Sequence, residues 1–423
     1  MPPPRDDRRS APARRRGERS PLALEHLAQR PLAQDADTVL PDLIVRSPGW
    51  HAHLFKRRLG AFPNDARHGD YVRFVTGDGL PLGCGYFNPR AEITARILSR
   101  RDEPLDSAWW DARLRQAVDL RRGTLGLDAE TNAYRVLHAE GDGLPGVVVD
   151  RYGETLVAEV FTLGMQQRAV DLLSRLSALV ETPHWMVRPG PSTLEQEGFI
   201  GELLHSTAPP RRTVIREHGV EFEVDLAGGH KTGFFCDQRD NRRRLALWAR
   251  PGKMLDLCCY SGGFSVAAAL GGRPSEITAV DLDEDATEMA RRNAQRNRVK
   301  VRCVHADAFA YMRDMLREGR QFETVVLDPP KLIDGRAEAE AGRRKYFDFN
   351  RLALQLVAPG GLLLTCSCSG LLSAEEFGKI VCSATPEGRR LQILHRSGAG
   401  PDHPVAGDCP ETEYLKAIWV QVQ

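Results

Sequence analysis

No stretch of the sequence approaches the roughly 18 consecutive apolar residues that a membrane-spanning helix requires. The opening run MPPPRDDRRS lacks the apolar core of a secretion signal, and acidic residues interrupt its arginines, unlike an organelle transit peptide. The formal net charge of the 423 residues is only +1, so overall charge does not identify a nucleic-acid partner. Any such partner must be argued from local basic surface.

Several motifs that would define other protein classes are also missing. The nine cysteines are irregularly spaced, and neither Cys258-Cys259 nor Cys366-Ser-Cys368 has zinc-finger spacing. We therefore expect reduced thiols, a cytoplasmic location and no bound metal. The chain has neither the GxGxxG fingerprint of nicotinamide dinucleotide enzymes nor a Walker lysine pattern.

Composition and periodicity divide the chain into four segments. Residues 1–38 are rich in Pro, Arg, Ala and Asp, and we interpret them as a disordered tail. Residues 39–115 contain short strand-like runs typical of a small β-barrel, and residues 116–210 mix helix and hairpin signals typical of an α+β unit. In residues 211–423 buried strands alternate with helices, which predicts a doubly wound parallel sheet of the α/β class.

The barrel-like segment carries basic and aromatic side chains that suit RNA, where phosphates and unstacked bases are both available. An ordinary solvated barrel face explains the same composition equally well. The side chains concerned are Lys56, Arg57, Arg58, Arg90 and Arg96, with Trp50, His51 and His53 nearby.

Glycines and acids follow the first three strands of the α/β segment. Gly262 and Gly263 allow a close backbone approach to a ligand. Asp281, about 20 residues further on, can accept both hydroxyls of a ribose, and Asp307 can accept an adenine amino group. Each acid alone is more often a capping residue. Together, at successive strand ends, they predict a cofactor that contains adenosine.

The fourth and fifth strands end in residues suited to chemistry on a heterocycle. Asp328 is held in a rigid loop by Pro329 and Pro330, and a carboxylate there can grip the polar edge of a flat base. Cys366 and Cys368 follow the next strand, where a thiolate can add to C6 of a pyrimidine and make C5 nucleophilic. Two small buried cysteines are the plain alternative.

From about residue 41 onward the chain resembles the RlmI/RlmO-like family of bacterial 23S rRNA 5-methylcytosine methyltransferases. The resemblance rests on AEGDGLPGVVVDRYG, GHKTGFFCDQRDNRR, DPPK, SCSG, DHPV and EYLKA, in that order. It implies an N-terminal PUA RNA-binding domain, an α+β middle domain and a class I methyltransferase domain that uses S-adenosylmethionine (SAM). It also implies large-subunit rRNA as the partner, Cys368 as the nucleophile and Asp328 as its acidic partner.

The same resemblance assigns further residues to the pocket. Asp237 and Gln238 are expected beside the cofactor. The side chains expected to face the substrate are Pro329, Pro330, Lys331 and Arg239.

Some alternatives remain open. Other RNA cytosine methyltransferases have the nucleophile after a threonine, as in Thr365-Cys366, so Cys366 is a second candidate. The target could be C5 of uracil or an amino group of guanine or adenine, or the chain could be an RNA-binding ribosome assembly factor without turnover. A homodimer is compatible with the sequence.

Overall fold

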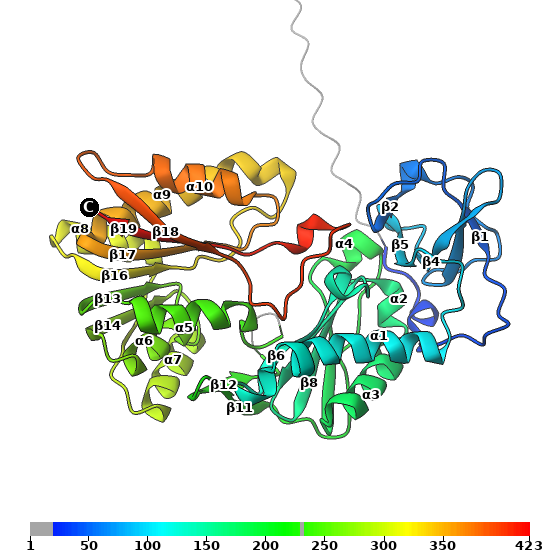
Figure 1. Cartoon of the computed structure of the whole chain (residues 1–423), viewed down its shortest axis with the longest axis horizontal. Helices are drawn as coiled ribbons and strands as arrows, with labels where there is room; N and C mark the ends of the chain where they lie inside the picture. The colour runs from blue at the N-terminus through cyan, green and yellow to red at the C-terminus, as the bar shows by residue number, and fades with distance from the viewer. Residues whose placement is uncertain (1–19, 229–231) are drawn as a thin grey trace, which may run out of the picture.

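The computed structural model describes residues 20–228 and 232–423, so the predicted tail up to residue 19 and the first three residues of GHKTGFF lie outside the described residues. The chain forms a five-stranded N-terminal sheet, a five-stranded middle sheet and a seven-stranded C-terminal sheet (Figure 1). A two-stranded hairpin lies between the middle and C-terminal sheets. Within the described residues, no helix combines the length and apolarity needed to cross a membrane.

The N-terminal sheet has the strand order β1-β3-β4-β5-β2, with β1 parallel to β3 and the other pairs antiparallel. A bridge between Val45 and Leu59 brings its two edges toward closure, as expected for a small barrel. Leu43, Val72 and Phe74 are among its buried core residues. Its strands are β1 (Asp42–Ile44), β2 (His53–Phe55), β3 (Tyr71–Val75), β4 (Pro81–Phe87) and β5 (Ile93–Ser99).

The middle sheet, in the order β10-β9-β8-β7-β6, shares one hydrophobic core with the N-terminal sheet. The predicted hairpin at GDGLPG joins β6 to β7. Helix α1 (Ser107–Asp119) lies across the predicted boundary at residue 115 and packs against α3 and β6. The remaining elements are β6 (Ala133–His138), β7 (Val147–Tyr152), β8 (Thr155–Val160), α2 (Leu163–Gln166), α3 (Ala169–Val180), β9 (His184–Pro189), α4 (Thr193–Glu197) and β10 (Leu204–His205).

Residues 20–38 correct the prediction of a disordered tail for that part of the segment. Leu32 is fully buried in the shared core, and its backbone N–H donates to Asp171 at 2.8 Å. Leu22 packs against Leu163 and Phe199. A few well-placed leucines therefore anchor a segment whose average composition is polar.

The C-terminal sheet has the order β15-β14-β13-β16-β17-β19-β18, with β19 antiparallel to both of its neighbours. Helices α5–α7 cover one face and α8–α10 cover the other (Figure 1). This confirms the predicted doubly wound sheet, to which β18 and β19 are additions. Its strands are β13 (Gly252–Leu257), β14 (Pro274–Asp281), β15 (Arg302–His305), β16 (Phe322–Leu327), β17 (Val357–Ser367), β18 (Leu391–Ser397) and β19 (Lys416–Val422). Its helices are α5 (Arg239–Trp248), α6 (Gly263–Leu270), α7 (Glu284–Arg296), α8 (Ala308–Arg317), α9 (Ala339–Leu356) and α10 (Ala374–Ser383).

Two connections tie the C-terminal sheet to the rest of the chain. The hairpin of β11 (Arg212–Glu217) and β12 (Val220–Asp225) contributes to a core that includes residues of the middle sheet and of α6 and α7. The second connection, the 398–415 loop, joins β18 to β19 and reaches the N-terminal sheet (Figure 1). In this loop the fully buried Asp402 accepts hydrogen bonds from the Arg239 guanidinium at 2.8 and 3.0 Å. Asp402 also accepts the Arg135 backbone N–H at 2.9 Å.

Replacing Asp402 by alanine should destabilise the protein strongly, because Arg239 would remain buried without its counter-ion. We expect a loss of roughly 3–5 kcal/mol in the free energy of unfolding. Lys379→Ala is the control, since it breaks only the exposed Lys379–Glu375 pair and should cost less than about 1 kcal/mol. Urea denaturation followed by circular dichroism measures both. Equal losses in the two variants would contradict a central role for Asp402.

Candidate active site

A cavity of about 600 Å³ opens at the carboxyl ends of the C-terminal strands, where the strand order reverses. Ten of the residues proposed from the sequence line it. They are Asp237, Gln238, Gly263, Asp281, Asp307, Asp328, Pro329, Pro330, Lys331 and Cys368. The parallel register explains this convergence, since successive strands deliver their carboxyl ends to one edge.

The loop after β13 has a strained backbone. Cys258 and Tyr260 have φ angles of 59° and 46°, a region that side chains other than glycine rarely adopt. The Tyr260 backbone N–H donates to Asp281 Oδ2 at 2.7 Å, which holds the loop against β14. Gly262 immediately precedes α6 with φ 78°, and a Cβ there would lie only 3.0 Å from the Ala290 side chain. Gly262 therefore shapes the loop but does not line the cavity.

Two of the predicted cofactor acids have structural partners as well. Asp281 Oδ1 accepts the Asp283 backbone N–H at 3.0 Å, so its carboxylate is fixed in orientation. Asp307 caps α8 by accepting the Ala310 N–H at 2.8 Å. A carboxylate oxygen has more than one lone pair, so neither contact prevents a further hydrogen bond from a ligand.

A third acid, Asp256, lies fully buried beneath the loop. Burial raises its pKa to about 7, and the nearby charges of Asp328 and Asp281 act in the same direction. Its Oδ2 accepts from both the backbone and the hydroxyl of Ser265, at 3.1 and 2.7 Å. Asp256 thus anchors the first turn of α6 beside the cavity.

Asp328 is held by a chain of polar side chains. Gln238 Nε2 donates to Asp328 Oδ2 at 3.0 Å, and Asn241 donates to Gln238 Oε1 at 2.6 Å. Asn241 in turn accepts from the Ser397 hydroxyl at 2.7 Å. The orientation of Asp328 therefore depends on α5 and β18 as well as on its own loop.

Cys368 lies just beyond β17, half-buried at the cavity wall. Lys416 interacts electrostatically with it, and burial lowers the pKa of Lys416 to about 8. The ammonium donates to the backbone oxygens of Ser369 at 2.6 Å and Tyr414 at 2.7 Å. A positive charge held in this way favours the thiolate form of a neighbouring cysteine.

Cys366 does not reach the cavity. It is fully buried on β17, within a cluster that contains Trp419 and Ala417. Burial raises its pKa well above the ordinary value, and Asp328 adds to the effect. A neutral, packed thiol is a poor nucleophile, so the geometry favours Cys368 of the two candidates.

Arg239 also lies away from the cavity, which corrects its expected contact with the substrate. Only 1% of its side chain is exposed, because its guanidinium is committed to Asp402. Arg96, which the sequence placed among the basic side chains that suit RNA, instead forms a buried ion pair with Glu197 at 2.6 Å. Both arginines meet acids that lie far away in the sequence.

The sequence reasoning missed an aromatic wall of the cavity and Lys416. Phe234, Phe235 and Tyr260 line the cavity, and the Phe235 and Tyr260 rings meet edge to face with centroids 5.0 Å apart. Arg242 holds this wall by donating to the Phe235 carbonyl at 2.9 Å. The available signals were the GFF run, whose aromatics could equally have belonged to a core, and the lysine of EYLKA, to which no role was assigned.

This cavity and sheet define a class I methyltransferase. The profile of the S-adenosylmethionine-dependent methyltransferase family matches residues 142–418, and that of the PUA-like domain matches residues 51–100. The chain belongs to the SAM-dependent methyltransferase family, and its cofactor is SAM.

Relatives named ribosomal RNA large subunit methyltransferase I are similar over nearly their whole length. The protein from Tolumonas auensis is 37% identical over 379 residues, covering 88% of this chain and 95% of the relative. The protein from Vibrio cholerae is 35% identical over 381 residues, with the same coverage.

Solved structures share the fold. A methyltransferase-fold protein from Streptococcus mutans superposes with a TM-score of 0.76 at 20% identity, covering 90% of this chain and all of that one. Another such structure, complexed with SAH, gives a TM-score of 0.77 with equal identity and coverage.

The residues at the cavity fit SAM. Acids at the ends of β14, β15 and β16 suit a ligand with a sulfonium charge, ribose hydroxyls and an adenine amino group. A side chain at Gly263 would meet Arg242 Cδ at 3.0 Å, so this turn stays open because it is glycine. Binding of SAM supplies the transferable methyl group here.

The raised pKa of Asp256 predicts a pH-dependent stability. The folded state keeps the Asp256 proton up to about pH 7, whereas the unfolded chain loses it near pH 4, so folding becomes less favourable as pH rises through this window. Relative to Asp256→Asn, the wild type should lose roughly 2–3 kcal/mol of stability between about pH 5 and pH 8. Urea denaturation of both proteins at the two pH values measures this difference. A difference independent of pH would contradict a protonated Asp256.

Proposed function

We propose that the protein transfers a methyl group from SAM to C5 of a cytosine in large-subunit ribosomal RNA, in the cytoplasm. The single observation that carries the proposal is a thiol and a carboxylate at one cavity that also holds the cofactor acids. The names of the relatives support rRNA as the substrate. The C5 position and the covalent step rest on the chemistry of Cys368 and Asp328.

The reaction begins with attack of the Cys368 thiolate on C6 of the flipped base, which forms a sulfur–carbon bond and makes C5 nucleophilic. Asp328 holds or protonates the N3 edge and so accommodates the electrons displaced from the ring. C5 then takes the methyl group and loses its proton to solvent or a nearby base. The electrons of that C–H bond restore the ring double bond as the thiolate leaves C6.

RNA capture is assigned to the PUA-like domain. Trp50 is 73% exposed, and the Arg100 guanidinium lies 5.1 Å from its ring centroid. Lys56 and Arg57 are exposed in the short helix that follows β2 in the same domain. An exposed aromatic ring with neighbouring cations suits an unstacked base and its phosphates.

Methylation of an exocyclic amino group fits the site less well. Enzymes of that class commonly follow the Pro-Pro pair with an aromatic residue that stacks on the base, and this chain has Lys331 there. Lys331 is exposed and lies 3.7 Å from Asp334. Methylation of uracil C5 uses the same thiol and acid chemistry, so the nucleoside product distinguishes it.

Cys368→Ala should reduce methyl transfer by about 1,000-fold or more while SAM still binds, because the substitution removes the nucleophile and leaves the cofactor acids in place. The assay uses labelled SAM and large-subunit rRNA from a strain that lacks this protein. Mass spectrometry of the digested RNA should detect 5-methylcytosine with the wild type. Calorimetry measures SAM binding by the variant.

Cys366→Ala is the matched control and should retain transfer, since Cys366 lies outside the cavity. Full activity of the Cys368 variant would remove the covalent mechanism. Detection of 5-methyluridine or an N-methylated base would replace the cytosine assignment.

Lys416→Met should lower kcat at neutral pH by roughly fivefold, because it removes the positive charge that favours the thiolate. The kcat–pH profile should move to higher pH, so that alkaline buffer restores most of the activity, with little change in KM for RNA. Loss of activity at every pH would indicate a structural role for Lys416 instead.

A further inference from the structure

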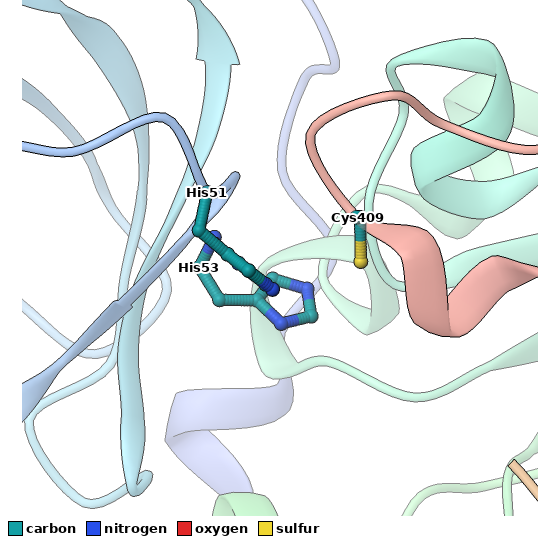
Figure 2. A group of neighbouring side chains, drawn as sticks. All are labelled: His51, His53 and Cys409. Atoms are coloured by element: carbon teal, nitrogen blue, oxygen red, sulfur yellow. The ribbon is translucent and has the colours of Figure 1, made fainter. Parts of the chain in front are cut away.

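Two histidines of the N-terminal sheet face a buried cysteine of the 398–415 loop (Figure 2). His51 precedes β2, His53 begins it, and Cys409 lies close to the end of the loop. One possible ligand atom from each residue lies within 4.8 Å of the others. Cys409 is 2% exposed and packs against Ala52, between the two histidines.

We propose that His51, His53 and Cys409, completed by Glu411, form a structural zinc site that joins the PUA-like domain to the methyltransferase domain. Imidazole nitrogen, thiolate sulfur and carboxylate oxygen are the ligands that zinc takes in four-coordinate sites. The proposal is independent of the RNA substrate and of the methylation chemistry.

The position of Glu411 supports it as the fourth ligand. A tetrahedral zinc ion with ordinary bond lengths separates nitrogen and oxygen ligands by about 3.3 Å, and sulfur and oxygen ligands by about 3.5 Å. Glu411 Oε2 lies 3.2 Å from His51 Nε2 and 3.5 Å from Cys409 Sγ. The ligand atoms of His51, His53 and Cys409 lie within 4.8 Å of one another, so these pairs would draw together by up to about 1.5 Å on binding, and Glu411 would shift toward His53.

The orientation of His53 supports the site as well, although His51 would lose one hydrogen bond on binding the metal. Glu140 Oε1 lies 2.9 Å from His53 Nε2 and gives that ring the carboxylate partner typical of metal-binding histidines. His51 Nδ1 accepts the His53 backbone N–H at 3.0 Å, and a neutral His51 would give up this contact to coordinate through Nε2.

Charge around Cys409 favours a dication. The carboxylates of Glu411 and Glu140 lie 3.2 Å from His51 Nε2 and 2.9 Å from His53 Nε2. Zinc would bind Cys409 as the thiolate, and the thiolate and the Glu411 carboxylate would then balance the two positive charges. The Glu411 side chain is 63% exposed, which leaves an open side through which an ion can enter.

The test uses the full chain, purified without a chelator and with any histidine tag removed. Elemental analysis should find about one zinc per chain after dialysis against zinc and gel filtration. Cys409→Ser and His53→Gln should each lose it. Cys382→Ser is the matched control, because Cys382 is an exposed cysteine on α10 and should keep the metal.

Cobalt substitution provides a second readout that does not depend on activity. The wild type should show the intense visible bands of four-coordinate cobalt and a thiolate-to-cobalt charge-transfer band, and Cys409→Ser should lose the latter. Circular dichroism checks that each variant is folded. Zinc at background level in the wild type, or full retention in both ligand variants, overturns the proposal.

Discussion

The arrangement of the cavity depends on one buried carboxylate. Asp402 lies on the loop between β18 and β19 and is fully enclosed. It is bound at once by Arg239 of α5 and by the backbone of β6. Its own carbonyl accepts from the buried Arg121 at 2.6 Å. Desolvating so many charges is unfavourable unless every one is paired, so these segments have little freedom to move separately.

The same network orients the residues that are proposed to carry the chemistry. Fixing Arg239 also fixes the two residues before it, and Asp237 accepts the Tyr414 hydroxyl at 2.5 Å while Gln238 holds Asp328. Lys416, two residues after Tyr414, lies beside Cys368. The proposed acid, Asp328, and the proposed nucleophile, Cys368, are therefore oriented from the same C-terminal hairpin. Such second-layer support is what keeps a reactive geometry within tenths of an ångström.

The sequence predicted the features that follow from local pattern. Alternating buried strands and helices indicated the parallel sheet, and parallel strands necessarily bring Asp281, Asp307 and Asp328 to one edge. The sequence did not predict the position of a residue where a partner far away in the chain determines it. Arg239 was expected to face the substrate because the sequence does not show that Asp402, 163 positions away in the chain, binds its guanidinium. Residues 20–38 read as disordered because composition does not reveal that Leu32 enters a core built from other segments.

The 398–415 loop contacts both the C-terminal domain and the PUA-like domain. The N-terminal and middle sheets share one core, so they form one packed body beside the C-terminal sheet. Toward one end of the loop, Asp402 accepts hydrogen bonds from Arg239 of the C-terminal domain. Further along it, Asp408 accepts a hydrogen bond from Arg100 of the PUA-like domain at 2.8 Å. The segment from 402 to 409 is short and paired at both ends. In the proposed reaction, the distance between a base held by the N-terminal body and Cys368 is therefore set by this loop rather than by a flexible linker.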